Sequence, residues 1–366
     1  MTYVYPITSK YNQVDLRPQL DAAASRLHQK LLQVHLTEIG ISEYNQSKIA
    51  EYLANPIANF QLFNYLIELS LFSYDGALQD FVCIDYGGGS GVLSLLAKEL
   101  GIGTVIYNDI YDVSCKDIEL LSKALNLDVD HIVHGDIDAV IRFVQKHSLG
   151  IHAITSRDVI EHIYDIETFL EQLALLSAQP FRVVMSTGAN TKNPRVRRDL
   201  VKTHMTSEYQ NREKQWGHKE RDALQSYLDI RKQIIQEYDD SLPADVVDEL
   251  ASKTRGLMKT DIEACVDDYR QTGTVTYEPH HPTNTCDPYT GNWAERLMDI
   301  RHLESVLEKS GFDVKTLGGF YSSSVAFHKK LVKAVLNTGI KHLGKAGLYV
   351  APFIILTAVR KHVQIM

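Results

Sequence analysis

The residues with the clearest chemical potential form a glycine turn between a short apolar segment and a helical one. The sequence CIDYGGGSG places glycines at Gly87, Gly89 and Gly91. Backbone N–H groups in such a turn, together with the N-terminus of the next helix, can bind the polar parts of a nucleotide-like ligand. Dinucleotide-binding turns have glycine or alanine at the sixth position, which is Val92 here. The spacing therefore departs from the nicotinamide pattern.

Acidic side chains accompany the turn and the apolar segments that follow it. Asp85 precedes the turn, and Asp109 lies 22 residues after Gly87, where a carboxylate can accept hydrogen bonds from both ribose hydroxyls. Asp136 can accept a hydrogen bond from an adenine amino group, and Asp158 follows a fourth apolar segment. Such acids also serve as helix N-caps. Their repetition in this order favours a ligand crevice at the carboxyl ends of parallel strands.

Five apolar segments alternate with helical patterns between residues 81 and 187. This alternation predicts a parallel sheet with right-handed crossovers and helices on both faces. The predicted strands are FVCID, TVIYND, HIVHGD, GIHAITSRD and PFRVVMST.

The rest of the chain surrounds this α/β core. A helical N-terminal cap is expected, divided at Asn55-Pro56 by an N-cap and a first helical position. A charged region with scattered apolar positions predicts an insertion of long helices, and a loop over residues 272–293 follows it. The sheet pattern then resumes with a helix at RHLESVLEKSGF, a strand at DVKTLGGFY, a helix from about Ser323 to Leu343 and a strand at APFIILTAV. The expected boundaries are 1–75 for the cap, 76–189 for the core, 190–299 for the insertion and 300–366 for completion of the core.

Composition limits the class of protein. The chain has 366 residues, 44% of them hydrophobic, and 38 Lys+Arg against 46 Asp+Glu give a net charge of −8. This is globular composition, and the negative charge argues against nonspecific binding to nucleic acid or to an anionic membrane, unless a local basic patch is present. The N-terminus has no apolar signal-peptide region, and no CxxC pair is present. A cytoplasmic protein with reduced thiols is expected; its cysteines are Cys83, Cys115, Cys265 and Cys286.

These motifs resemble those of class I S-adenosylmethionine-dependent methyltransferases, in particular the ubiquinone-biosynthesis O-methyltransferases and other small-molecule methyltransferases. The resemblance covers Phe81 to Thr187 well and Arg301 to Arg360 moderately. It implies a doubly wound, Rossmann-like sheet of seven mostly parallel strands, with APFIILTAVR as an antiparallel last strand. It also implies S-adenosylmethionine as the cofactor. The segments that carry the resemblance are CIDYGGGSG, VIYNDI, HGDI, DVIEHIYDIETFL and VVMST.

The resemblance also implies roles for individual residues. The acid and the glycines of the turn would hold the methionine part of the cofactor, the acid after the second strand would hold the ribose, and the acid after the third strand would hold the adenine. The expected cofactor-binding set is Asp85, Gly87, Gly89, Gly91, Asp109, Ile110, Asp136, Ile137 and Asp158.

Methyl transfer from a sulfonium requires mainly alignment of the acceptor and exclusion of water. A hydroxyl acceptor also benefits from a general base. By family topology His162 would lie near the methyl group, with Glu161 to orient it; alternatively, both residues cap and pack the following helix. Asp158, Glu161 and His162 are also compatible with a divalent metal. Three ligands on one turn are too few, so no metal site is assigned.

Candidates for the acceptor site come from the insertion. His280, His281 and Trp293 lie in or beside its loop, and long irregular loops concentrate substrate contacts. The histidines could instead be solvated, and the tryptophan could be buried. His204 and Glu208, four residues apart on an expected helix, are weaker candidates.

Two surfaces suggest partners. Residues 328–345 form a basic amphipathic pattern that could contact a membrane peripherally, although such a helix more often packs its apolar side on the core. The charged helices of the insertion could form a homo-oligomer interface.

The expected function is therefore methyl transfer from S-adenosylmethionine to a small-molecule acceptor at oxygen. The alternatives are a nicotinamide-dependent oxidoreductase and a non-catalytic methyltransferase-like binding subunit. A nucleic-acid methyltransferase ranks low, because no Asn-Pro-Pro-aromatic or Asp-Pro-Pro-Tyr tetrapeptide follows the fourth strand.

Overall fold

The structure is a computed structural model that describes residues 16–72, 74–177, 181–211, 224–322 and 327–360. The first residues of the N-terminal cap, and the expected helix start near Ser323, lie outside this part. The chain divides into two compact units, which are described separately. Unit 1 comprises Met1–Ile160, Glu167–Asn193 and Asp299–Met366, and unit 2 comprises Glu161–Ile166 and Pro194–Met298.

The described part of unit 1 contains a sheet of seven strands in the order β3-β2-β1-β4-β5-β7-β6. Neighbouring strands among β1 to β5 pair in parallel, whereas β7 pairs antiparallel with both β5 and β6. The predicted doubly wound α/β fold with an antiparallel last strand is confirmed. The strands are β1 Val82–Tyr86, β2 Thr104–Asp109, β3 His131–His134, β4 Ala153–Arg157, β5 Arg182–Thr187, β6 Phe312–Gly318 and β7 Ile354–Arg360.

The strand order determines which face each connecting helix covers. The chain moves outward from β1 to β3 through α4 and α5, then returns past β1 to β4 and β5 through α6 and α7. Because parallel crossovers are right-handed, the two pairs of helices lie on opposite faces. These helices are α4 Val92–Leu100, α5 Asp112–Leu125, α6 Ile137–His147 and α7 Ile166–Gln172, and α12 Ile300–Lys309 precedes β6.

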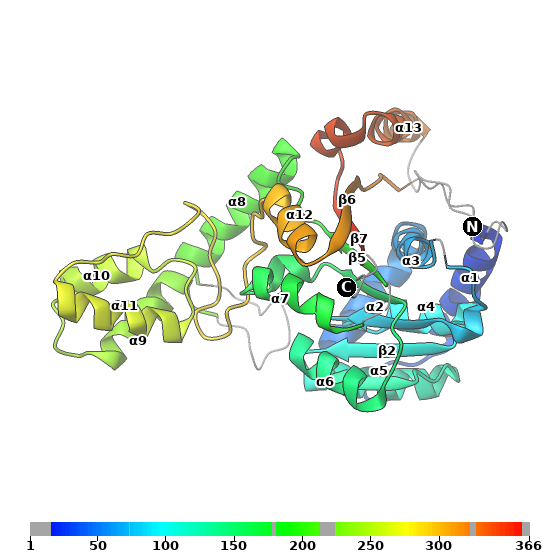
Figure 1. Cartoon of the computed structure of the whole chain (residues 1–366), viewed down its shortest axis with the longest axis horizontal. Coiled ribbons are helices and arrows are strands. Elements are labelled where there is room, and N and C mark those ends of the chain that lie inside the picture. Colours follow the sequence, from blue (N-terminus) through cyan, green and yellow to red (C-terminus); the bar gives the residue numbers. More distant parts are fainter. Residues whose placement is uncertain (1–15, 73, 178–180, 212–223, 323–326, 361–366) are drawn as a thin grey trace, which may run out of the picture. The chain divides into compact units, whose positions relative to one another are not determined.

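The N-terminal helices belong to the same hydrophobic core as α4 and α5. One buried cluster joins Leu27 and Phe60 to Leu95 and Ile118, and Figure 1 shows α1, α3 and α4 side by side. As predicted, Asn55 is the N-cap of a helix that begins at Pro56, although the Asn55 side chain makes no capping hydrogen bond. Proline favours a break here, because it cannot continue the preceding helix and disfavours helical backbone at the residue before it. The helices are α1 Arg17–Gln33, α2 Glu43–Ala54 and α3 Pro56–Ser70.

Unit 2 has its own small hydrophobic core, to which Ile230, Leu250 and Ile262 contribute. Its helices are shorter than the long helices expected from the charge pattern. Pro243 precedes one helix, and Gly273 ends another in the left-handed conformation. The helices are α8 Pro194–Tyr209, α9 Tyr227–Tyr238, α10 Ala244–Lys253 and α11 Lys259–Thr272.

The connection between β6 and β7 contains α13, Phe327–His342, and a 3-10 segment, Gly344–Tyr349. Of the helices described, none has both the length and the hydropathy needed to cross a bilayer.

Candidate functional sites

The glycine turn after β1 is closed on two sides and open on one. Gly87, Gly89 and Gly91 all adopt left-handed φ angles of 65°, 54° and 75°. A Cβ at the first would lie 2.6 Å from Val159, and one at the third would lie 2.1 Å from Ile118, so neither position has room for a side chain. At Gly89, by contrast, nothing lies within 4 Å of the Cβ position. The turn thus presents bare backbone to an open side.

Three consecutive residues of β2 hold this turn in place. The Tyr107 hydroxyl donates a hydrogen bond to the carbonyl of Gly89 at 2.6 Å. The backbone N–H of Gly88 donates to the carbonyl of Asn108 at 2.8 Å, and that of Gly89 donates to Asp109 Oδ2 at 2.9 Å. The open backbone is therefore fixed in position without a ligand. Tyr107 was missed in the sequence because it lies within a continuous apolar strand, where nothing distinguishes it from a core residue.

Asp109, the residue predicted to bind ribose, is the last residue of β2. Besides the bond to the turn, its Oδ1 accepts the backbone N–H of Tyr111 at 2.8 Å. These bonds orient a carboxylate that is only 5% exposed, and a carboxylate has capacity for further hydrogen bonds. Ile110 follows with a 47% exposed side chain, which offers an apolar contact beside it. The two residues can serve one face of a nucleoside.

The other predicted acids have local partners. Asp136 is the N-cap of α6 and accepts the backbone N–H of Ala139 at 3.1 Å, while Ile137 is buried. Asp158 has a φ of 54°, and its Oδ1 accepts the N–H of Gly188 at 3.0 Å. Asp136 therefore caps a helix, and Asp158 holds a loop through its hydrogen bond to Gly188. Contacts of either acid with a cofactor stay a prediction.

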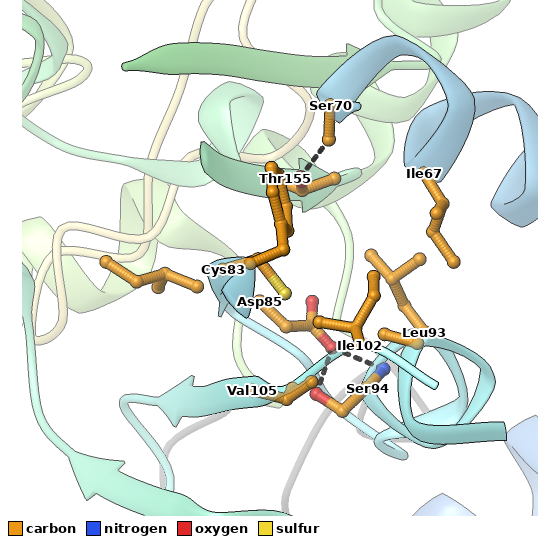
Figure 2. Close-up of a pocket in the computed structure, with 12 residues that line it drawn as sticks. Ile67, Ser70, Cys83, Asp85, Leu93, Ser94, Ile102, Val105 and Thr155 are labelled. Atoms are coloured by element: carbon orange, nitrogen blue, oxygen red, sulfur yellow. Dashed lines mark hydrogen bonds between the residues drawn. The ribbon is translucent and has the colours of Figure 1, made fainter. Parts of the chain in front are cut away.

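Asp85 supports the turn from behind. Its Oδ2 accepts hydrogen bonds from the backbone N–H and the hydroxyl of Ser94, at 3.0 and 2.7 Å (Figure 2). The first of these bonds satisfies an N–H in the first turn of α4 that has no partner within the helix. Burial raises the pKa of Asp85 to about 7, against the lowering effect of the Ser94 bonds, and the charge of Asp109 adds to the rise.

A small cavity lies next to this carboxyl group. It measures about 20 Å³ and is lined by apolar side chains together with Asp85, Ser94, Ser70 and Thr155 (Figure 2). The hydroxyls of Ser70 and Thr155 are hydrogen-bonded to each other at 2.7 Å. A space of this size holds about one water molecule, so it is part of the core and not a substrate site.

A second candidate site lies within unit 2, where Glu161, His162 and Glu295 converge. Their ligand atoms all lie within 4.8 Å of one another. His162 Nδ1 lies 2.8 Å from the carbonyl oxygen of Trp293. Because a carbonyl can only accept, Nδ1 carries the proton, and the lone pair of a neutral ring is on Nε2. That atom lies 3.8 Å from Glu295 Oε1.

This geometry suits two kinds of chemistry. The side chain of His162 is 35% exposed, so Nε2 can be reached by a ligand and can act as a general base. One imidazole and two carboxylates are also suitable ligands for a divalent cation. Glu295 was missed in the sequence, since no spacing rule connects it to the segment after β4. It has a φ of 60°, a conformation that non-glycine residues rarely adopt.

Trp293 anchors the loop beside this cluster. Its ring stacks on that of Tyr164 with the centroids 5.9 Å apart, its Nε1 donates to the Tyr164 carbonyl at 3.1 Å, and the Arg296 guanidinium lies 4.8 Å from its centroid. A Cβ at Gly256 would lie 2.9 Å from the indole. The packing of the indole thus fixes the position of the Trp293 backbone carbonyl, which orients the His162 ring.

The predicted substrate histidines fall into two groups. His204 is buried, with Nε2 2.7 Å from the Glu295 carbonyl and Nδ1 3.2 Å from the Thr283 hydroxyl. His281 Nδ1 lies 3.2 Å from the same hydroxyl. Burial lowers the pKa of both rings. His280 is exposed and packs edge-on to Tyr277. The Thr283 hydroxyl therefore connects His204 with His281, whereas His280 packs against Tyr277 instead.

Glu208 has a packing role in unit 2. It is buried, lies within ion-pair distance of Arg231 and Arg255, and accepts a hydrogen bond from the Thr285 hydroxyl. Burial would raise the pKa of its carboxyl group, but the two guanidinium groups and the hydrogen bonds lower it overall. Its hydrogen-bonding capacity serves the interior of this unit.

Comparison with known proteins finds similarity at the level of solved structures. No family model matches the chain, and no curated protein sequence matches it. A candidate S-adenosylmethionine-dependent methyltransferase from Streptococcus mutans has 16% identity and a TM-score of 0.29, covering 36% of this chain and 35% of its own. A methyltransferase solved in complex with S-adenosylhomocysteine has 15% identity and a TM-score of 0.29, covering 38% of each chain.

An S-adenosylmethionine-dependent methyltransferase from Mesorhizobium loti covers 78% of this chain and 93% of its own, with 12% identity and a TM-score of 0.36. The chain thus spans little more than a third of the first two structures and most of the third. Similarity this low decides neither fold nor function. The fold is established by strand order and pairing, and the function must be argued from residues.

The raised pKa of Asp85 leads to a prediction about stability. Its folded-state pKa of about 7 lies above the unfolded value of 3.8, so the folded protein binds more protons between these values. The free energy of unfolding should therefore fall as pH rises from about 4 to about 7. Asp85→Asn keeps an acceptor for Ser94 and cannot titrate. Relative to wild type, the variant should gain roughly 2–4 kcal/mol across this window in urea unfolding. If the free energies of unfolding of the two proteins changed in parallel with pH, the raised pKa of Asp85 would be contradicted.

Proposed function

We propose that this protein is a methyltransferase that transfers a methyl group from S-adenosylmethionine to a small molecule with a hydroxyl acceptor. The observation that carries the proposal is the open backbone at Gly89, fixed beside the oriented carboxylate of Asp109. This combination suits a ligand with a ribose and a polar tail close together. The sheet of seven mostly parallel strands, with β7 antiparallel, is the sheet that the sequence resemblance implies.

Different residues of unit 1 would bind different parts of the cofactor. The backbone of the glycine turn, with Asp85 bracing it from behind, would hold the methionine part. Asp109 and Ile110 would hold the ribose, and Asp136, Ile137 and Asp158 would line the remainder. When bound, the cofactor supplies a methyl group already activated on a sulfonium. The chain's own tasks are then to align the acceptor and to exclude water.

In unit 2, His162 is the group best placed to take a proton from a hydroxyl. Its Nδ1–H is held by the Trp293 carbonyl, so that Nε2 is the basic atom. Glu161 and Glu295 lie close enough to stabilise the imidazolium once it forms. His204, His281 and Trp293 would shape the surroundings of this base, and His280 would contact the acceptor from the loop surface.

The alternatives fit less well. A nicotinamide-dependent enzyme would be expected to have a small residue at Val92, and here that side chain is buried. A non-catalytic binding subunit would have no need of the open turn and the oriented carboxylate together. A nucleic-acid substrate is disfavoured by the net charge of −8.

Asp109→Ala tests the cofactor site. Loss of two charge-assisted hydrogen bonds to ribose should weaken S-adenosylhomocysteine binding about a hundredfold in isothermal titration. Asp130→Ala is a matched control, because Asp130 Oδ2 accepts the N–H of Val105 at the opposite end of the same strand. The control should bind like wild type.

Thermal shift assays with wild type separate the ligand classes: S-adenosylhomocysteine should raise the melting temperature and NADH should not. The reverse result, or equal affinity in the two aspartate variants, would contradict the proposal.

His162→Gln tests the base. In a panel of hydroxyl acceptors, turnover should fall about 10²- to 10⁴-fold, because proton removal is lost, while S-adenosylhomocysteine affinity stays unchanged. His302→Gln is the control, since His302 Nε2 also lies beside a glutamate, at 3.0 Å from Glu167 Oε1.

Unchanged turnover in His162→Gln would exclude the base. If a chelator abolishes wild-type turnover and a divalent cation restores it, the cluster holds a metal instead.

A further inference from the structure

Helix α13 carries an exposed apolar row on one face. Leu331, Val332 and Val335 are 68%, 59% and 65% exposed, and their spacing of one, three and four residues places them together on a helix. Leu343 and Tyr349, after the helix, are also exposed. Single exposed apolar side chains are ordinary, but a group of them marks a surface that contacts something other than water. The three residues on the helix, Leu331, Val332 and Val335, are called the α13 apolar face.

The other side of α13 is already packed within unit 1. The Asn337 side chain accepts the N–H of Tyr321 at 2.8 Å and donates to its carbonyl at 2.9 Å. Ile340 is buried, and Cβ atoms at Gly318 and Gly347 would meet it at 2.8 Å or less. These contacts fix the rotation of the helix. The α13 apolar face cannot turn inward without breaking them, so it faces outward; Figure 1 shows the helix at the margin of this unit.

The charge around this face differs from that of the whole protein. The 53 residues after Asp313 contain eight Lys or Arg and no Asp or Glu, although the chain has a net charge of −8. Lys341 is exposed at the end of the same helix, Lys333 donates to the Ser322 carbonyl, and Lys345 pairs with Glu304 of α12 at 3.5 Å. An apolar row on a segment that is basic and has no acid of its own attracts a partner that is both apolar and anionic.

We infer that the α13 apolar face binds the surface of an anionic lipid membrane. The leucine and valine side chains enter the boundary between headgroups and acyl chains, and the lysines meet lipid phosphates and carboxylates. Two copies of the chain meeting through this face would bring like charges together, which opposes association. The inference concerns where the protein resides, and it does not depend on the proposed methyl transfer.

Co-sedimentation of the full chain with vesicles tests this inference. Binding is expected to phosphatidylcholine vesicles that contain phosphatidylserine, at low salt, and much less to phosphatidylcholine alone or at high salt. Leu331→Gln should weaken the partition about tenfold. Leu175→Gln is its matched control, because Leu175 is 59% exposed in a 3-10 turn elsewhere in unit 1, and it should bind like wild type.

A second pair of variants tests the contribution of the lysine charges to vesicle binding. Lys341→Gln should weaken binding to the anionic vesicles about fivefold, and Lys202→Gln, on α8, should leave it unchanged. The inference is overturned if wild type fails to bind anionic vesicles at low salt, or if Leu331→Gln and Leu175→Gln bind equally. It is also overturned if light scattering shows a wild-type dimer that Leu331→Gln dissociates without any lipid binding, since the face would then join two copies.

Discussion

The candidate cofactor site depends on one set of hydrogen bonds, those that fasten the glycine turn to β2. Tyr107, Asn108 and Asp109 hold Gly88 and Gly89 from the neighbouring strand. Left-handed backbone at the glycines makes this path possible, and close packing against Val159 and Ile118 excludes side chains on the other sides. The open backbone and the acid are therefore held together in advance, so a ligand need not order them.

Much of the fold could be predicted because local patterns agreed with the tertiary structure. The predicted strand TVIYND is β2, and the predicted helix IDAVIRFVQKH is α6, residue for residue. The strand is a short apolar run that ends in an acid, and in the helix apolar periodicity and the Asp136 cap coincide. The insertion is divided into more and shorter helices than its charge pattern indicated, and one of the divisions falls at Pro243, just before α10. Asn55 and Pro56 do occupy the predicted N-cap and first helical positions, although the Asn55 side chain makes no capping hydrogen bond.

The candidate sites could also be predicted only in part from the sequence. The acids at the strand ends could be found in the sequence, because the carboxyl ends of parallel strands lie at one edge of the sheet. Their hydrogen-bond partners could not be predicted: Asp136, for example, caps α6. Glu295 beside His162 depends on how the loop of unit 2 folds back, which no local spacing encodes. Likewise, the basic pattern of α13 was visible in the sequence, whereas the side that stays exposed is decided by the packing of Asn337 and Ile340.

We propose that the cofactor lies on the open side of the glycine turn. Gly89 and Gly101 flank the two ends of α4, both have positive φ, and both would give a Cβ no neighbour within 4 Å. Alanine at either position should therefore cost similar backbone strain, about 1 kcal/mol. The direct measurement is isothermal titration of Gly89→Ala and Gly101→Ala with S-adenosylhomocysteine. The account predicts at least about tenfold weaker binding for the first variant and wild-type binding for the second. Equal affinity in both would show that the open side of the turn does not hold the ligand.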